Sequence, residues 1–181
     1  MARKETITKD AIIQAAFAIL QEEGIEQVTA RKLAAKANCS TQPIFRFYKS
    51  MDEVTAELAD RSCQFFQDYY DQFQRQTVTP FVNLGQAYIR FAGEHKEIFK
   101  FIFLSPDRCK RSMYDILNGS KGNVSKEIQS ATAQGSRNAG DLFTKMWIFI
   151  HGAACMSLTG DYDLSDNETM QLLRDSYHSF K

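Results

Sequence analysis

The chain has 181 residues, of which 44% are hydrophobic, 24% are charged, 9 are glycine and 3 are proline. This composition is close to the globular average, and it argues against disordered, collagen-like and turn-rich sandwich structures. The formal net charge is zero, from 22 basic and 22 acidic residues, which argues against a generally basic nucleic-acid binder. No apolar run approaches the roughly 20 residues of a membrane span, and residues 1–20 lack the pattern of a signal peptide, so we expect a cytoplasmic protein.

The first 50 residues predict three short helices, because apolar residues recur there at helical spacing. Thr8, Thr29 and Ser40 are placed as N-caps, and Gly24 is placed to end the first helix. Pro43 falls in the first turn of the third helix, where its missing N–H costs little. The expected helices cover residues 8–23, 30–36 and 41–47.

The remaining residues also predict helices, and none of them shows convincing strand alternation. Two capping boxes, Ser50 with Glu53 and Ser165 with Glu168, mark helix starts. The expected helices cover 50–76, a segment beginning at Thr79-Pro80, 105–117, 123–134, 141–159 and 165–179, with a short aromatic segment at 96–104. We therefore predict an all-α chain of about nine helices.

The zero net charge hides an asymmetry along the chain. Residues 1–50 contain 8 Lys/Arg and 5 Asp/Glu, a net charge of +3, whereas residues 51–181 contain 14 and 17, a net charge of −3. Such asymmetry indicates that one end meets an anionic partner. We therefore expect two domains, residues 1–50 and residues 51–181, of which the first binds the anionic partner.

The second and third helices, joined by a tight turn at residues 37–40, form a helix-turn-helix unit. This geometry offers the third helix to the major groove of DNA. Gln42 can pair with adenine and Arg46 with guanine or phosphate, while helix N-termini at Thr29 and Ser40 suit phosphate oxygens. The expected DNA-binding residues are Thr29, Arg31, Lys32, Ser40, Thr41, Gln42, Pro43, Phe45, Arg46, Phe47 and Lys49.

Two runs in this unit, TARKLAAKANCS at 29–40 and IFRFYKS at 44–50, carry a family resemblance. With the residues around them, from 8 to 54, they resemble the TetR family of bacterial transcriptional regulators. The later segments YIRFAGEHKEIFKFIF and MWIFIHGAA are similar to stretches in many members. The resemblance implies a DNA-binding domain over 1–50 and an all-helical regulatory domain over 51–181 for ligand binding and dimerisation. It also implies a small-molecule effector and a repressor that this effector releases from DNA.

The sequence departs from the family pattern at four positions. Gln42 replaces the usual Gly, Pro43 the usual Thr, Phe45 the usual Tyr and Met51 the usual Lys. The last two changes remove groups that often contact phosphate. We expect weaker backbone binding, or compensation by Lys49, Lys9 and the segment at Arg3-Lys4.

Aromatic residues are frequent after residue 64, and the resemblance implies a ligand cavity among the middle helices. A cavity needs apolar walls with a few polar groups that orient the ligand. The candidates are Phe66, Tyr70, Tyr88, Phe91, Phe103, Tyr114, Trp147 and His151, each of which could instead be ordinary core. Aromatic walls with few acids suggest an apolar or aromatic effector.

The helices at 141–159 and 165–179 are more apolar than one neighbour can cover. We therefore expect them to form a four-helix interface between two copies, which would read a palindromic operator. A monomeric core is the alternative. The expected interface residues are Trp147, Ile150, Gly152, Ala154, Leu158, Leu172, Leu173 and Tyr177.

No pattern for catalysis or metal binding stands out. The four cysteines are widely spaced and form no ligand spacing with the three histidines, so neither a metal nor a cofactor is expected. The sequence has no Ser-His-acid motif and no phosphate-cradling glycine loop, so an enzyme is not expected. The alternative function is a DNA-binding or adaptor protein without a small-molecule effector, controlled by a protein partner.

Overall fold

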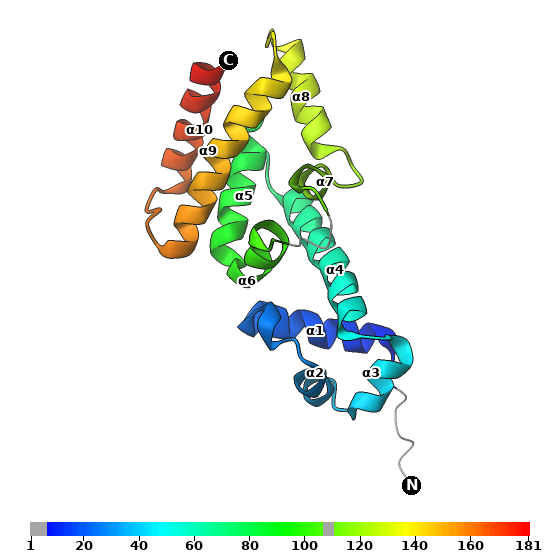
Figure 1. The fold of residues 1–181 in the computed structure, drawn as a ribbon. Coiled ribbons are helices and arrows are strands. Elements are labelled where there is room, and N and C mark those ends of the chain that lie inside the picture. The colour runs from blue at the N-terminus through cyan, green and yellow to red at the C-terminus, as the bar shows by residue number, and fades with distance from the viewer. Residues whose placement is uncertain (1–6, 107–110) are drawn as a thin grey trace. The chain divides into compact units, whose positions relative to one another are not determined.

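The computed structural model describes residues 7–106 and 111–181, and every regular element in these two ranges is a helix (Figure 1). The predicted all-α fold class is confirmed. The described residues contain ten α-helices, a 3₁₀ turn and a π-helical turn. No helix within these ranges has the length and apolar character that a membrane crossing requires.

The chain divides into two compact units, which are described separately. The N-terminal unit contains the chain up to Gln64 together with the segment Glu97–Arg111. The body unit contains Phe65–Lys96 and Ser112–Lys181. Helix α4 (Met51–Gln72) is continuous and contributes residues to both units.

Three helices and a 3₁₀ turn form most of the N-terminal unit. They are α1 (Lys9–Glu23), η1 (Ile25–Gln27), α2 (Ala30–Lys36) and α3 (Thr41–Phe47). Ile12, Leu20, Leu33 and Ile44 are fully buried, so one apolar stripe from each α-helix meets in a small core. The Thr8 side chain accepts a hydrogen bond from the Ala11 N–H at 3.1 Å and begins α1 as predicted.

The same unit contains the short aromatic segment expected at 96–104. It forms α6 (Lys96–Phe99), followed by the π-helical turn η2 (Lys100–Leu104). The rings of Phe99 and Phe103 lie 5.0 Å apart, and both side chains are fully buried. Gly24, at the end of α1, approaches the Glu97 side chain so closely that a Cβ there would lie 2.8 Å from a carboxylate oxygen.

The body unit is built around α5 (Val82–Glu94), which packs along α9 (Ala139–Thr159) and α10 (Asp166–Phe180), as Figure 1 shows. Gly85 permits this close approach, because a Cβ there would lie 2.8 Å from Ile150 Cδ1 and 3.2 Å from Leu173 Cδ1. The unit also contains α7 (Met113–Asn118) and α8 (Asn123–Ala133). Its core therefore lies where α9 and α10 cover α5.

Several helix boundaries differ from the sequence-based expectation. Helix α4 ends at Gln72, and α5 begins only at Val82, because Phe81 adopts a left-handed conformation with φ of 65°. Part of the helix expected at 105–117 lies outside the described residues, and α7 begins at Met113, where the Ser112 side chain accepts the Asp115 N–H.

The two predicted capping boxes have different outcomes. The box at Ser165 and Glu168 is present at the start of α10. At the start of α4, Glu53 instead accepts the backbone N–H of Lys49 at 2.7 Å, one residue before the expected position. The carboxylate still satisfies a donor near the helix N-terminus.

Candidate DNA-binding surface and ligand pocket

The turn between α2 and α3 is tight because Asn38 adopts a left-handed conformation, with φ of 51°. Asparagine tolerates this conformation better than most residues that carry a side chain. The Cys39 N–H then donates to the Ala34 carbonyl at 2.9 Å and closes the turn. Helix α3 is thereby held against α1 and α2 by its buried Ile44, and its other side chains except Pro43 are exposed.

The predicted DNA-binding residues lie on the α2–turn–α3 segment, and most of them face solvent. The exposed members are Thr29, Arg31, Ser40, Thr41, Gln42, Phe45, Arg46, Phe47 and Lys49, while Lys32 and Pro43 are half-buried. Phe45 is 49% exposed and Phe47 is 38% exposed, so neither ring is ordinary core. The structure therefore brings these side chains to one exposed segment.

The N-terminus of α3 differs from that of α2 in how its cap is used. The Thr29 hydroxyl accepts the Lys32 N–H at 3.3 Å. Ser40 occupies the N-cap position of α3 in an extended conformation, but its side chain makes no capping hydrogen bond. The Ser40 hydroxyl and the first N–H groups of α3 are thus available to an external acceptor such as a phosphate oxygen.

The cations around this surface fall into two groups. Lys32 pairs with Glu23, Lys36 pairs with Glu22 at 2.7 Å, and Lys9 pairs with Glu57 at 2.6 Å. None of the described residues forms an ion pair with the second group, which is Arg31, Arg46 and Lys49. Carboxylates of α1 and α4 therefore pair with three of these cations, and the cations that form no ion pair within the described residues lie on α2, on α3 and just after it.

The predicted ligand-pocket aromatics are brought together only in part. Phe66 contacts Phe91 at a ring distance of 5.0 Å, and Tyr88 contacts Trp147 at 4.7 Å. The Tyr88 hydroxyl and His151 Nδ1 are 3.0 Å apart. These five side chains pack against one another as an aromatic cluster across α4, α5 and α9.

The other three candidates lie elsewhere. Phe103 is buried in the N-terminal unit, and Tyr114 is 41% exposed on α7. Tyr70 is buried in the body unit, and its hydroxyl has no hydrogen-bond partner among the described residues. Burial raises the pKa of Tyr70 to about 12, and the nearby negative charge of Glu127 adds to the shift.

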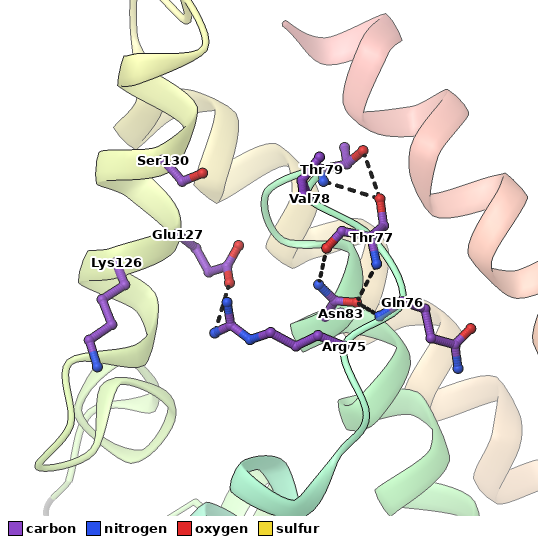
Figure 2. A pocket seen from close by; sticks show the side chains of 9 residues that line it. All are labelled: Arg75, Gln76, Thr77, Val78, Thr79, Asn83, Lys126, Glu127 and Ser130. Carbon is purple, nitrogen blue, oxygen red and sulfur yellow. Dashed lines mark hydrogen bonds and ion pairs between the residues drawn. The ribbon is translucent and has the colours of Figure 1, made fainter.

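An open pocket of about 760 Å³ lies between the α4–α5 connection and α8, and none of the predicted residues lines it (Figure 2). It falls in the range of small-molecule sites, and eight of its nine lining residues are polar or charged. The lining residues are Arg75, Gln76, Thr77, Val78, Thr79, Asn83, Lys126, Glu127 and Ser130.

One wall of this pocket is held rigid by hydrogen bonds to its backbone. The Asn83 side chain accepts the Gln76 N–H at 2.9 Å and donates to the Thr77 carbonyl at 2.7 Å. At the C-terminal end of α8, the Gln134 side-chain amide donates to the Val78 carbonyl at 3.0 Å. A binding site whose wall is already ordered loses less conformational freedom when a ligand arrives.

Glu127 lies at the bottom of the pocket and is 6% exposed. Its Oε2 accepts the Phe81 N–H at 2.7 Å, which stabilises the left-handed residue before α5. Its Oε1 lies 3.9 Å from the Arg75 guanidinium, whose side chain is 65% exposed. A sequence signal for this residue exists, because Glu127 interrupts the buried stripe that Val124 and Ala131 form on α8.

The residues expected at a dimer interface divide into two groups. Ile150, Ala154, Leu173 and Tyr177 are buried inside the body unit. Trp147, Leu158 and Leu172 are half-buried, and Gly152 is exposed with no atom within 4 Å of a Cβ placed on it. The exposed apolar side chains of α9 are Ile148, at 68%, and Met156, at 46%. Together with Gly152 they form an exposed face of α9.

Residues 12–58, which include all of the α2–turn–α3 segment, match the family described as bacterial regulatory proteins, tetR family. Residues 12–58 are a TetR-family helix-turn-helix domain. Among curated proteins, none matches the chain.

Solved structures of TetR-family regulators share the fold of nearly the whole chain. A TetR-like transcriptional regulator from Rhodococcus sp. RHA1 is 16% identical, with a TM-score of 0.59 over 94% of this chain and 93% of that one. A TetR family transcription regulator from Marinobacter aquaeolei VT8 is also 16% identical, with a TM-score of 0.63 over 94% and 93%. The TetR-family repressor FadR of Thermus thermophilus, solved in complex with lauroyl-CoA, is 14% identical, with a TM-score of 0.50 over 96% and 93%. The chain therefore shares its overall fold with these solved structures.

Proposed function

We propose that this protein is a ligand-responsive transcriptional repressor that binds a palindromic DNA operator as a homodimer. The observation that carries the proposal is the exposed α2–turn–α3 segment, in which polar and cationic side chains face solvent within a TetR-family domain. Gln42 is the proposed base-reading residue, because an amide group pairs with base edges in the major groove, and Arg46 is proposed to bind guanine or a phosphate. A regulator of chromosomal DNA acts in the cytoplasm, and we propose that location.

Dimerisation is proposed through the exposed face of α9, formed by Ile148, Gly152 and Met156. Two large apolar side chains exposed on the same face of α9 favour a partner, and Gly152 between them lets a second helix approach closely. Two copies related by a two-fold axis would present two α3 helices to half-sites about one helical turn apart. We propose residues 1–50 as the DNA-binding domain and 51–181 as the domain for effector binding and dimerisation.

The proposed effector is a small apolar or aromatic molecule that enters the aromatic cluster around Tyr88. The complex of Thermus thermophilus FadR with lauroyl-CoA supports the idea that this fold responds to an acyl ligand. The Tyr88 hydroxyl and His151 would supply the polar contact inside an otherwise apolar wall. Because these side chains now pack against one another, binding would need the cluster to open, and an effector that binds the open form shifts the population towards it.

A gel-shift measurement with the DNA upstream of the protein's own gene tests DNA recognition. We expect a sequence-specific band that Gln42→Ala weakens about tenfold relative to random DNA, since a good base pairing contributes about 1–3 kcal/mol of discrimination. The matched control is Gln129→Ala, an exposed glutamine on α8 in the body unit. If no duplex from that region gives a specific band at low salt, the proposal is wrong.

A second candidate function is a DNA-binding or adaptor protein without a small-molecule effector. The close packing of Phe66, Tyr88 and Phe91 favours this second function, because the three rings contact one another and all three are fully buried. Acyl and aromatic compounds that release the operator band would exclude this candidate. A protein partner that releases the band when no such compound does would support it.

A further inference from the structure

The polar pocket contains a buried carboxylate whose charge is only partly compensated. Glu127 Oε2 accepts the Phe81 N–H at 2.7 Å, whereas Oε1 lies 3.9 Å from the Arg75 guanidinium, and the Tyr70 hydroxyl lies near both charged groups. That distance exceeds the range of a hydrogen bond, and the mostly exposed Arg75 side chain is a weak partner. Because burying a charge is costly unless it is paired and hydrogen-bonded, Oε1 remains an attractive site for a further donor.

Two buried tyrosine hydroxyls lie close enough to Glu127 to be affected by its charge. The hydroxyls of Tyr70 and Tyr177 are buried, and neither has a hydrogen-bond partner among the described residues. Burial raises the pKa of Tyr177, and the charge of Glu127 raises it further, as for Tyr70.

We propose that this pocket binds a small organic ammonium ion, with Glu127 Oε1 as its counter-ion. The ammonium group takes the place of the Arg75 guanidinium, which turns outward into solvent. The Ser130 hydroxyl, one turn along α8 from Glu127, offers an acceptor for a further N–H group (Figure 2). The inference concerns binding at this pocket and does not depend on DNA recognition or on the effector proposed for the aromatic cluster.

The competing occupant is an anion held by the two cations at the pocket, Arg75 and Lys126. Geometry favours the ammonium ion, because Lys126 extends away from Glu127 and Arg75 is directed at the carboxylate (Figure 2). An anion at the centre of the pocket would approach a buried carboxylate, and like charges in a desolvated site repel strongly. The two occupants predict opposite effects of removing Arg75.

The test is calorimetric titration of the full chain with butylammonium chloride and, as the anion of equal length, sodium butyrate, at constant ionic strength. The wild-type protein should bind butylammonium and not butyrate. Arg75→Gln should bind butylammonium about two- to fivefold more tightly, because an exposed ion pair competing for Oε1 is lost. Glu127→Gln should bind it at least about tenfold more weakly.

The matched control is Lys126→Gln, which removes a cation of the same pocket that does not face Glu127, and should change butylammonium binding by less than about twofold. Circular dichroism establishes whether Glu127→Gln is folded. If it is not, the titrations of wild type and Arg75→Gln with butylammonium and butyrate test the proposal without it. Butyrate binding that Arg75→Gln abolishes would show an anion site instead. The absence of butylammonium binding to both wild type and Arg75→Gln, up to about 10 mM, would also overturn the proposal.

Discussion

The charge distribution around α3 predicts how DNA binding should depend on salt. Arg31, Arg46 and Lys49 lack an ion-pair partner among the described residues, so each is available to a phosphate. Binding to duplex DNA weakens with salt by a slope of about −0.9 in log–log form for each phosphate neutralised. A dimer with three free cations in each copy should therefore give a slope of about −5.4. Arg46→Gln removes one cation from each copy and should reduce the slope to about −3.6.

Fluorescence anisotropy with a labelled random-sequence duplex measures this slope between about 50 and 200 mM salt. The matched control is Arg137→Gln, which removes an exposed arginine from the body unit and should leave the slope unchanged. An unchanged slope in Arg46→Gln would refute the assignment of this residue to the DNA surface. A wild-type slope near −9, by contrast, would mean that Lys32 and Lys36 leave their carboxylates and also bind phosphate.

Three further predictions follow from the packing and the ion pairs. Gly85→Ala should be about 1–3 kcal/mol less stable in urea unfolding than Gly93→Ala, because only the first introduces a Cβ into the α5–α9–α10 contact; equal stabilities would contradict the close packing. Ile148→Asp should convert the dimer to a monomer in analytical ultracentrifugation, whereas Val78→Asp, also at an exposed apolar side chain, should not; a dimeric Ile148→Asp would exclude the α9 face. Glu23→Gln releases Lys32 from its ion pair and should tighten binding to random DNA about two- to fivefold in anisotropy. Weaker binding would contradict the idea that Glu23 competes with DNA phosphates for Lys32.

The helix-turn-helix unit could be predicted in detail because its signals act over short distances. Thr8 and Thr29 cap their helices as expected, and Pro43 sits in the first turn of α3. A cap satisfies N–H groups two or three residues away, so the sequence already contains both partners. The exposure of Gln42 and Arg46 follows equally directly, because Ile44 supplies the buried side of a two-turn helix.

The candidate pocket could not be predicted, because its parts come from distant segments. Glu127 meets the Phe81 N–H and Arg75 only when α8 lies beside the α4–α5 connection. The same contact favours the left-handed residue that delays the start of α5. A carboxylate within an apolar helical stripe was visible in the sequence, but its partners were not.

The sequence by itself determined an all-helical chain with a cationic helix-turn-helix segment, since caps, helical periodicity and local charge are properties of neighbouring residues. It also showed that α9 is apolar almost all round, without showing which side stays exposed. Tertiary structure decided that question: Gly85 lets α5 approach until Ile150 and Leu173 are buried, and this leaves Ile148 and Met156 on the outside. Burial depends on which partner covers a surface, and that partner is separated from α9 by more than 40 residues of chain, beyond the reach of any local pattern.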